Sequence, residues 1–300
     1  MENFSLFFVT IVFVLQSIAA DGSEPECGIS EDPPSHHRII NGTLARKGQL
    51  PWIAYTNTFT LCTASIISRN YVLTAGHCVV NESGDVMETA QVKVGTIDQF
   101  DTAALTVVSE EHGVIPHPKY NATPPCDKSP AYDIAIIKLS KSLNFTEYVR
   151  PICLKKTFEE TESDVALISG YGAKIWFHLP CSPCPMDAYD GKLRWGTSKF
   201  VDEQQCRRKL SEVEQDCLSG SPIVCARGIH QVETFLGDSG GPLAVVNSNK
   251  ADGKKQYMQV GVTSTADGDN FQGIPSTYTR VSSHCDWIAE VTGGEVNCRD

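Results

Sequence analysis

The sequence predicts an all-β fold, either a barrel or a sandwich. Short runs rich in Val, Ile, Thr and Tyr follow one another from residue 39 onward. Gly, Pro, Asn and Asp separate these runs, which is the turn chemistry of antiparallel β proteins. The composition, 41% hydrophobic and 20% charged, is that of a globular domain. The expected strands are Ala64–Ile67, Tyr71–Thr74, Gln91–Val94, Leu105–Val108, Ile134–Leu139, Val165–Ser169, Leu243–Val246 and Met258–Val262.

One helix is expected near the carboxyl end. It would run from about Ser283 to Val291, with Gly293 and Gly294 as its stop.

The first 20 residues resemble a signal peptide. Residues 5–20 form one apolar run that ends in small residues, with a cleavage site near Ala19 or Ala20. The leader contains Glu2 and no Lys or Arg, so an uncleaved anchor is the alternative. No later stretch is apolar and long enough to cross a bilayer. We therefore expect a secreted, extracellular protein without membrane contact after signal removal.

Residues 21–38 are acidic and Pro-rich, and they are expected to form a flexible arm that contains Cys27. The net charge of the chain is −11, part of which lies in the leader and this arm. The remaining domain, residues 39–300, is mildly acidic and has no electrostatic basis for binding nucleic acid.

Twelve cysteines agree with an oxidising compartment. Cys181 and Cys184 form one Cys-x-x-Cys pair, for which a zinc or redox site is the alternative to a disulfide-pinned surface loop. The loop is favoured because only one such pair exists and prolines flank it. Glycosylation sequons of a secreted glycoprotein begin at Asn41, Asn81, Asn121 and Asn144.

Three segments contain residue types suited to nucleophilic catalysis. His77 follows an expected strand in Leu-Thr-Ala-Gly-His-Cys, and Asp133 begins an apolar strand in Tyr-Asp-Ile-Ala-Ile-Ile. Ser239 lies in the glycine-rich segment Gly-Asp-Ser-Gly-Gly-Pro-Leu. Taken singly, each also fits a structural role: a packed histidine, a turn aspartate or a tight turn.

Together these segments resemble the chymotrypsin/trypsin family of serine proteases, peptidase S1. The order His, Asp, Ser is the one that this family uses. Further segments match in order along residues 39–292: Arg38–Gly42, Pro51–Trp52, Cys62, His117–Asn121, Val149–Leu154, Ile168–Gly172 and Ser276–Val281. The resemblance implies two packed six-stranded antiparallel β-barrels with a C-terminal α-helix. The catalytic cleft would lie between the barrels, with the split near residue 160.

The resemblance implies a serine endopeptidase in which His77, Asp133 and Ser239 are catalytic. A serine hydroxyl is a weak nucleophile until a base takes its proton, and a histidine of near-neutral pKa can be that base. Asp133 would fix the imidazole tautomer. The N–H groups of Gly237 and Ser239 would form the oxyanion hole.

Activation is implied by the segment that begins at Arg38. In this family a cut before the mature domain frees an amine that pairs with the acid preceding the nucleophile. Here these groups are the Ile39 amine and Asp238, which makes the protein a zymogen. The implied partners are an upstream protease cutting after Arg, a protein or peptide substrate, and protease inhibitors.

The resemblance also implies three disulfides: Cys62–Cys78, Cys206–Cys225 and Cys27–Cys153, the last tethering the arm. Two family bridges are absent, since Ala166 and Val245 replace one pair and Phe235 replaces a cysteine beside the specificity pocket. The sequence does not pair the six remaining cysteines: Cys126, Cys181, Cys184, Cys217, Cys285 and Cys298.

By resemblance, Ser264 supports Asp133, and residues 264–266 pair with substrate as an added strand. Glu233 stands where trypsins have an aspartate that pairs with Arg or Lys at P1, the substrate residue before the scissile bond. Ser276 and Ala266 replace pocket glycines and reduce the space. The alternatives are a basic P1 preference and a pocket for a smaller residue.

Three other functions fit the sequence less well than an endopeptidase. Gly-x-Ser-x-Gly also fits an α/β-hydrolase elbow, but a strand-like segment follows Ser239 and His284 is the only histidine after it. A non-catalytic, protease-like binding protein would normally lack a triad residue, and none is missing. A purely structural disulfide-rich module does not explain the three segments. The expected chemistry needs no cofactor and no metal.

Overall fold

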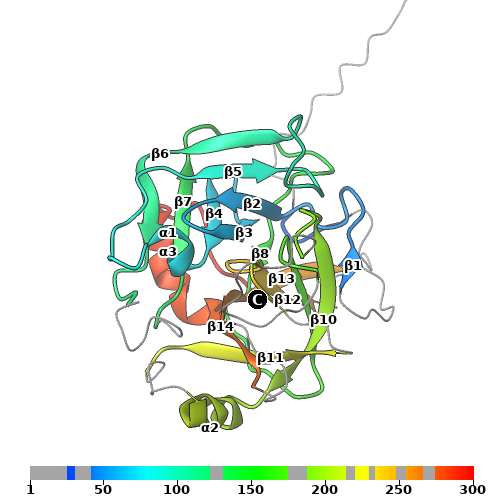
Figure 1. Ribbon diagram of the computed structural model, residues 1–300, viewed down its shortest axis with the longest axis vertical. Helices are drawn as coiled ribbons and strands as arrows, with labels where there is room; N and C mark the ends of the chain where they lie inside the picture. Colours follow the sequence, from blue (N-terminus) through cyan, green and yellow to red (C-terminus); the bar gives the residue numbers. More distant parts are fainter. Residues whose placement is uncertain are drawn as a thin grey trace, which may run out of the picture.

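Most strands belong to two closed β-barrels, one from each half of the chain (Figure 1). The computed structural model describes residues 26–30, 42–121, 131–174, 188–213, 220–229, 234–247, 255–265 and 274–300. Within these ranges the barrels account for the predicted all-β class.

The first barrel is an antiparallel ring in the order β2, β3, β4, β7, β6 and β5. Its inward side chains are largely Val, Ile, Leu and Ala, which suit a pleated, half-buried surface. The strands are β2 (Ile53–Asn57), β3 (Leu61–Ile66), β4 (Tyr71–Thr74), β5 (Gln91–Val94), β6 (Leu105–Pro116) and β7 (Ala135–Leu139).

The second barrel is the ring β9, β10, β11, β14, β13 and β12, closed by the antiparallel pairing of β9 with both β10 and β12. Two short strands add to it: β1 pairs with β10, and β8 runs parallel to β13. The bounds are β1 (Thr43–Leu44), β8 (Cys153–Leu154), β9 (Val165–Gly170), β10 (Arg194–Val201), β11 (Ile223–Gly228), β12 (Pro242–Asn247), β13 (Gln256–Thr265) and β14 (Ser276–Arg280). The predicted pair of six-stranded antiparallel barrels is confirmed.

The strand predictions hold in position and differ in length. β4 and β5 have the predicted bounds, whereas β6 continues eight residues past Val108, to Pro116. A register irregularity between Ser109 and Val114 bends β6, and His112 within it has φ 56°. A bulge of this kind bends one long strand, so local sequence suggests a shorter strand.

The predicted C-terminal helix is present as α3 (Cys285–Val291), preceded by the 3₁₀ turn η2 (Val281–His284). Gly293 and Gly294 end it with φ of 61° and 82°, which glycine adopts without steric cost. The disulfide Cys285–Cys298 ties the start of α3 to the carboxyl end.

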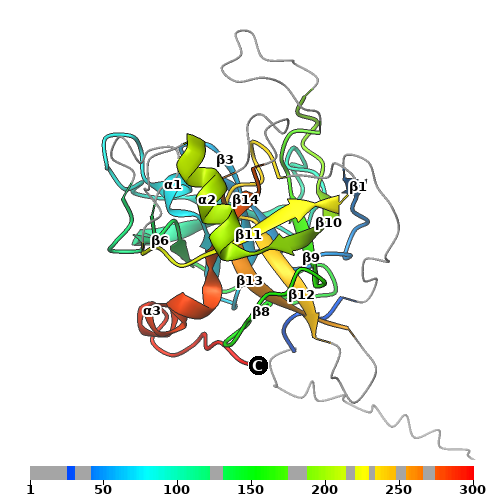
Figure 2. The ribbon, with the colours of Figure 1, turned by 90° about the horizontal axis from the view of Figure 1, so that it is seen from below.

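The prediction of one helix was incomplete, because α2 (Glu203–Val213) was not expected. The backbone N–H of Gln205 donates to the Asp202 carboxylate at 2.8 Å, a helix cap that the sequence displays. Cys206 and Leu210, one turn apart, pack with Ile223 and Cys225 of β11. Figure 2 shows α2 alongside β11. The mostly polar composition of this segment concealed a narrow apolar face.

The prediction of a flexible arm was wrong for residues 26–30. Cys27 joins Cys153, and the Gly28 N–H donates to the Pro151 carbonyl at 2.7 Å. Gly28 has φ 74°, and a β-carbon there would lie 2.1 Å from the Tyr257 carbonyl oxygen, so only glycine fits. A disulfide and backbone pairing therefore bind this part of the arm to the domain.

The three disulfides implied by resemblance are all present: Cys27–Cys153, Cys62–Cys78 and Cys206–Cys225. Ala166 packs in the core of the second barrel, with Val245 partly buried against the same cluster. Apolar packing thus occupies the region of one missing bridge. Cys126, Cys181, Cys184 and Cys217 lie outside the described residues, as do residues 1–25, Arg38, Ile39, Asn41, Glu233 and Ala266.

Candidate active site

The candidate catalytic residues come from elements that meet where the two barrels pack together. His77 lies on the short helix α1 (Gly76–Val79) after β4, and Asp133 lies just before β7. Ser264 is on β13, and Ser239 lies in the turn before β12. We call residues 237–241 the serine turn.

A glycine is required at the start of α1. A β-carbon on Gly76 would lie 2.6 Å from the ring of Tyr120, so a larger residue would displace either the ring or the helix. This close packing fixes the helix that carries His77.

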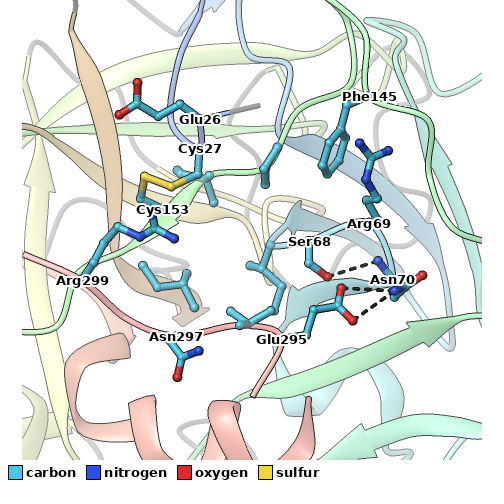
Figure 3. A pocket seen from close by; sticks show the side chains of 15 residues that line it. Glu26, Cys27, Ser68, Arg69, Asn70, Phe145, Cys153, Glu295, Asn297 and Arg299 are labelled. Carbon is cyan, nitrogen blue, oxygen red and sulfur yellow. Dashed lines mark hydrogen bonds between the residues drawn. A yellow bond between two sulfur atoms is a disulfide. The ribbon is translucent and has the colours of Figure 1, made fainter. Parts of the chain in front are cut away.

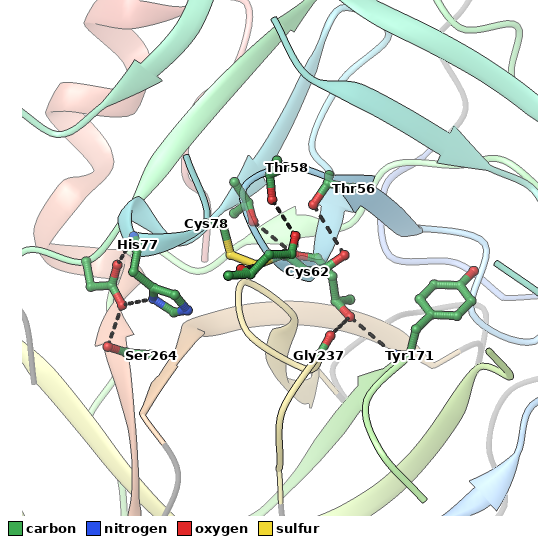
Figure 4. Close-up of a disulfide and its surroundings, with 12 residues drawn as sticks. Thr56, Thr58, Cys62, His77, Cys78, Tyr171, Gly237 and Ser264 are labelled. Carbon is green, nitrogen blue, oxygen red and sulfur yellow. Dashed lines mark hydrogen bonds and ion pairs between the residues drawn. A yellow bond between two sulfur atoms is a disulfide. The ribbon is translucent and has the colours of Figure 1, made fainter. Parts of the chain in front are cut away.

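His77 and Asp133 form a tight pair. The His77 Nδ1 atom lies 2.7 Å from Asp133 Oδ2, and the His77 backbone N–H donates to Asp133 Oδ1 at 2.8 Å. The Ser264 hydroxyl donates to Oδ2 at 2.6 Å (Figure 4). Asp133 is fully buried, whereas the His77 side chain is 27% exposed. The aspartate therefore orients the ring and leaves its other edge accessible.

The same contacts set the pKa values of the pair. Burial raises the pKa of Asp133, but the adjacent His77 and the hydrogen bonds from His77 and Ser264 outweigh it and lower the pKa below its usual value. For His77, burial acts to lower the pKa, and the Asp133 charge and hydrogen bond raise it above its usual value. Asp133 thus stays ionised and stabilises a proton on His77.

The serine turn leaves two N–H groups without an acceptor. The N–H groups of Asp238, Gly240 and Gly241 donate to the carbonyls of Phe235, Thr263 and Asp238, respectively. Among the described residues, no acceptor is bonded to the N–H groups of Gly237 and Ser239. Gly237 has φ 98°, a conformation that favours glycine. Two free donors on either side of Asp238 suit an oxyanion.

Close backbone packing places the serine turn beside the histidine. A β-carbon on Gly240 would lie 2.1 Å from Thr74 Oγ1 and 2.9 Å from the Ala75 backbone nitrogen, two residues before His77. The Thr63 N–H donates to the Ser239 carbonyl at 2.8 Å. In the described structure the Ser239 hydroxyl makes no hydrogen bond to His77. Such bonds often form only with substrate bound.

The Cys62–Cys78 disulfide lies directly beside His77 (Figure 4). Donor atoms of Cys62, Cys78 and His77 lie within 4.8 Å of one another. A cysteine binds zinc as a thiolate, and both sulfurs are bonded in the disulfide, so these residues do not form a metal site. The disulfide instead joins the α1 helix to β3.

Asp238 has a different environment from Asp133. Its carboxylate accepts hydrogen bonds from the backbone N–H groups of Gly172 at 2.8 Å and Phe235 at 3.0 Å. Burial raises the pKa of Asp238 to about 6, against the opposing effect of these two bonds and of the more distant Arg194. Within the described ranges no cation forms a salt bridge with it.

Of the three pocket residues expected from sequence, the structure describes one. Ser276 is buried at the start of β14, and the Thr234 hydroxyl donates to its Oγ at 3.2 Å. The Ser276 hydroxyl is therefore hydrogen-bonded to a neighbouring buried side chain. Glu233 and Ala266 lie outside the described residues, so their positions stay predictions.

A separate polar cavity of about 390 Å³ lies beside the Cys27–Cys153 disulfide (Figure 3). Its lining combines the arm with the carboxyl end of the chain, including Glu26, Glu295 and Arg299. None of His77, Asp133 or Ser239 lines it, so it is separate from the candidate catalytic residues.

Two packed β-barrels with a histidine–aspartate pair beside a glycine-rich serine turn define the architecture of the double-barrel serine proteases. A sequence model of the Trypsin family matches residues 39–288. The chain belongs to this family of serine proteases, which are hydrolases.

Several curated proteins are similar to the chain. It is 29% identical to Phenoloxidase-activating factor 3 of Holotrichia diomphalia, over 88% of this chain and 74% of that protein. It is 30% identical to Serine protease ea of Drosophila melanogaster, over 84% and 67%. It is 28% identical to CLIP domain-containing serine protease B9 of Anopheles gambiae, over 88% of this chain and 64% of that protein. Parts of these relatives therefore lie outside the match.

Among solved structures, neuropsin, a serine protease expressed in the limbic system of mouse brain, has the same fold with a TM-score of 0.64. It is 24% identical, and the match covers 85% of this chain and all of that one. No helix in the described part of the chain has the length and hydrophobicity needed to cross a membrane.

Proposed function

We propose that this protein is a secreted serine endopeptidase that hydrolyses peptide bonds through an acyl-enzyme. The observation that carries the proposal is the hydrogen-bonded series Ser264, Asp133 and His77 beside a serine turn with two free N–H groups. This combination supplies an oriented base, a nucleophile close to it and an anion site.

The proposed reaction begins when Ser239 Oγ attacks the scissile carbonyl carbon and its proton passes to His77 Nε2. The carbonyl oxygen becomes an oxyanion that accepts hydrogen bonds from the N–H groups of Gly237 and Ser239. The C–N bond then breaks, His77 gives its proton to the leaving amine, and an acyl-enzyme remains. Water repeats the sequence, with His77 as base, and releases the acid and free Ser239.

Asp133 supports the proton transfers without accepting the proton. Its bond to Nδ1 holds the tautomer in which Nε2 can act as a base, and its charge stabilises the imidazolium that forms. The Asp133 charge and hydrogen bond raise the pKa of His77, which stabilises that imidazolium.

Activation is proposed to follow a cut between Arg38 and Ile39. The new Ile39 amine would pair with Asp238, the residue that precedes the nucleophile. This is supported by a carboxylate that is enclosed by Gly170 and Gly172 and has a raised pKa, since a cation would relieve the cost of its charge. The Cys27–Cys153 bond would then keep the cut arm attached.

The proposed partners are protein substrates, an activating protease that cuts after Arg, and protease inhibitors. A place in a series of proteolytic steps is supported by the relative named Phenoloxidase-activating factor 3, because that name describes the activation of another enzyme. Secretion and glycosylation are proposed from the leader, the sequons and the disulfides.

A fluorophosphonate probe tests the proposal directly. Protein cut at Arg38 should be labelled at Ser239 and should hydrolyse peptide substrates, whereas the uncut protein and the Ser239→Ala variant should not be labelled. The alternative, a protease-like binding protein, predicts a folded, correctly cut chain that takes no label. Labelling of Ser239→Ala would show that the assigned nucleophile is wrong.

Glu233 is proposed to give the enzyme a preference for Arg or Lys at P1. Changing Glu233→Gln should lower kcat/KM for Arg and Lys substrates by about 10- to 100-fold, since a charge-assisted pair is lost. Substrates with Ala or Leu at P1 serve as the control and should change little. An equal loss on every substrate would mean that Glu233 does not contact the P1 side chain, and would favour the smaller-residue pocket.

A further inference from the structure

A buried threonine of the first barrel contacts the serine turn of the second at two points. Thr63 lies on β3 and has no exposed surface. Its backbone N–H donates to the Ser239 carbonyl at 2.8 Å, and its hydroxyl donates to the Gly237 carbonyl at 2.9 Å. The two contacts link separate barrels, because β3 is not a strand of the second ring.

The Thr63 hydroxyl also accepts a hydrogen bond. The Tyr171 N–H donates to Oγ1 at 3.2 Å, so one hydroxyl joins the residue after β9 to the serine turn (Figure 4). A β-carbon on Gly170 would lie 2.9 Å from this oxygen, and one on Gly241 would lie 3.2 Å from Thr63 Cγ2. The side chain is therefore closely packed between the end of β9 and the serine turn.

These contacts orient the peptide groups that flank the two free donors. The C=O and N–H of a trans peptide point in opposite directions, so a bonded carbonyl also fixes the N–H beyond it. The Ala173 N–H holds the Leu236 carbonyl, which directs the Gly237 N–H away from Ala173. Thr63 holds the next carbonyl, that of Gly237, and the one two residues further on, that of Ser239.

Gly237 is the residue of the turn that most needs such a restraint. Its φ of 98° and its lack of a β-carbon permit rotation of the peptide that joins it to Asp238. That rotation would move the Ser239 N–H relative to the Gly237 N–H, which the Leu236 carbonyl contact holds. We propose that Thr63 is a positioning residue for the oxyanion hole, whose hydroxyl fixes the peptide between Gly237 and Asp238. This rests on the proposed function of the serine turn.

Three variants separate positioning from simple stability. Thr63→Val keeps the shape and removes the hydroxyl, whereas Thr63→Ser keeps the hydroxyl. Thr292→Val is the matched control, because Thr292 is also buried and its hydroxyl also donates to a carbonyl, that of Ile288 at 2.7 Å, and accepts from an N–H, that of Val296 at 3.2 Å, without contacting the serine turn. All three are cut at Arg38, and the concentration of active enzyme is measured by fluorophosphonate titration.

Thr63→Val should lower kcat by about 10- to 100-fold with KM within about twofold of wild type, because an oxyanion donor that is misplaced acts mainly on the transition state. Thr63→Ser should restore most of kcat. Thr292→Val should lower the melting temperature by a similar amount and leave kcat unchanged. Equal kcat losses in Thr63→Val and Thr292→Val, or no loss in Thr63→Val, would overturn the proposal.

Hydrogen exchange in the Ser239→Ala background tests the contact independently of activity. Thr63→Val should accelerate exchange of the Tyr171, Asp238 and Gly241 amides relative to Thr292→Val. If wild type neither hydrolyses peptides nor takes the label, the proposed function fails, and this exchange still tests the Thr63 contact. Unchanged exchange at these amides would show that Thr63 does not hold the serine turn.

Discussion

Asp133 and Asp238 are two enclosed carboxylates of the candidate active site, and their pKa values shift in opposite directions. Asp133 has no exposed surface, yet its pKa is lowered. The Asp238 carboxylate is enclosed by Gly170 and Gly172, and its pKa is raised to about 6. Both carboxylates are enclosed, so burial alone does not explain the difference.

The groups that contact the two carboxylates explain the difference between their pKa values. Asp133 accepts from His77 twice and from Ser264, and an imidazolium can form beside it. Asp238 accepts only two backbone N–H bonds among the described residues, with no adjacent cation. Desolvation prevails where no opposite charge compensates it. Neighbouring groups compensate the charge of Asp133, whereas a positive charge beside Asp238 would stabilise its ionised form.

The largest expected effect is at Asp133. Asp133→Asn should lower kcat on the order of 10⁴-fold, because an amide stabilises the wrong His77 tautomer and no longer supports the imidazolium. It should also lower the pKa of His77, since the Asp133 charge raises it. The acid limb of the kcat/KM profile should therefore move to lower pH.

Ser264→Ala is the matched control, as it removes one hydrogen bond to Asp133 and keeps the charge. It should reduce kcat far less and leave the acid limb nearly in place. If Asp133→Asn did not move the acid limb, His77 would not be the group that titrates there.

A smaller loss of activity is expected when the chain cannot be cut, so that no Ile39 amine is available to pair with Asp238. Arg38→Gln should give a secreted protein with activity reduced by at least about 10²-fold, on the order of losing one oxyanion donor. Lys47→Gln is a control, because it removes a positive charge from an exposed position outside the proposed cleavage site. Full activity of intact, single-chain Arg38→Gln protein would contradict the activation proposal.

The smallest effect concerns stability of the uncut chain. The pKa of Asp238 is about 6 when folded and near 3.8 as an isolated group, so the folded chain retains a proton that the unfolded chain releases. Stability from this group is fully present below pH 4 and is lost as the pH rises through 6. The difference of about two units corresponds to at most roughly 3 kcal/mol, and solvent access reduces it.

In the Arg38→Gln background, Asp238→Asn should therefore raise the melting temperature at pH 7.5 and change it little at pH 4. Asp133→Asn should lower the melting temperature at pH 7.5, because the ionised form of Asp133 is the one that the fold stabilises. Thermal unfolding monitored by circular dichroism at the two pH values measures both. Shifts of the same sign would remove the contrast between the two carboxylates.

The sequence by itself determined the all-β class, most strand positions and the C-terminal helix. Turn residues and apolar runs are local signals, so they survive without knowledge of the fold. The three segments that contain the candidate catalytic residues were also recognisable, since each combines a reactive residue type with a characteristic local sequence, such as the glycines around Ser239. Resemblance, rather than local pattern, supplied the pairings Cys27–Cys153, Cys62–Cys78 and Cys206–Cys225.

Only the tertiary structure decided what depends on contacts between distant segments. Nothing near Thr63 in the sequence signals that its hydroxyl reaches Gly237, because 174 positions separate the two residues. The docking of residues 26–30, the Cys285–Cys298 pairing and the apolar face of α2 likewise depend on partners supplied by other elements. The opposite pKa shifts of Asp133 and Asp238 follow the same rule. Residue type sets the intrinsic pKa of a carboxyl group, and the fold determines which charges and hydrogen bonds surround it.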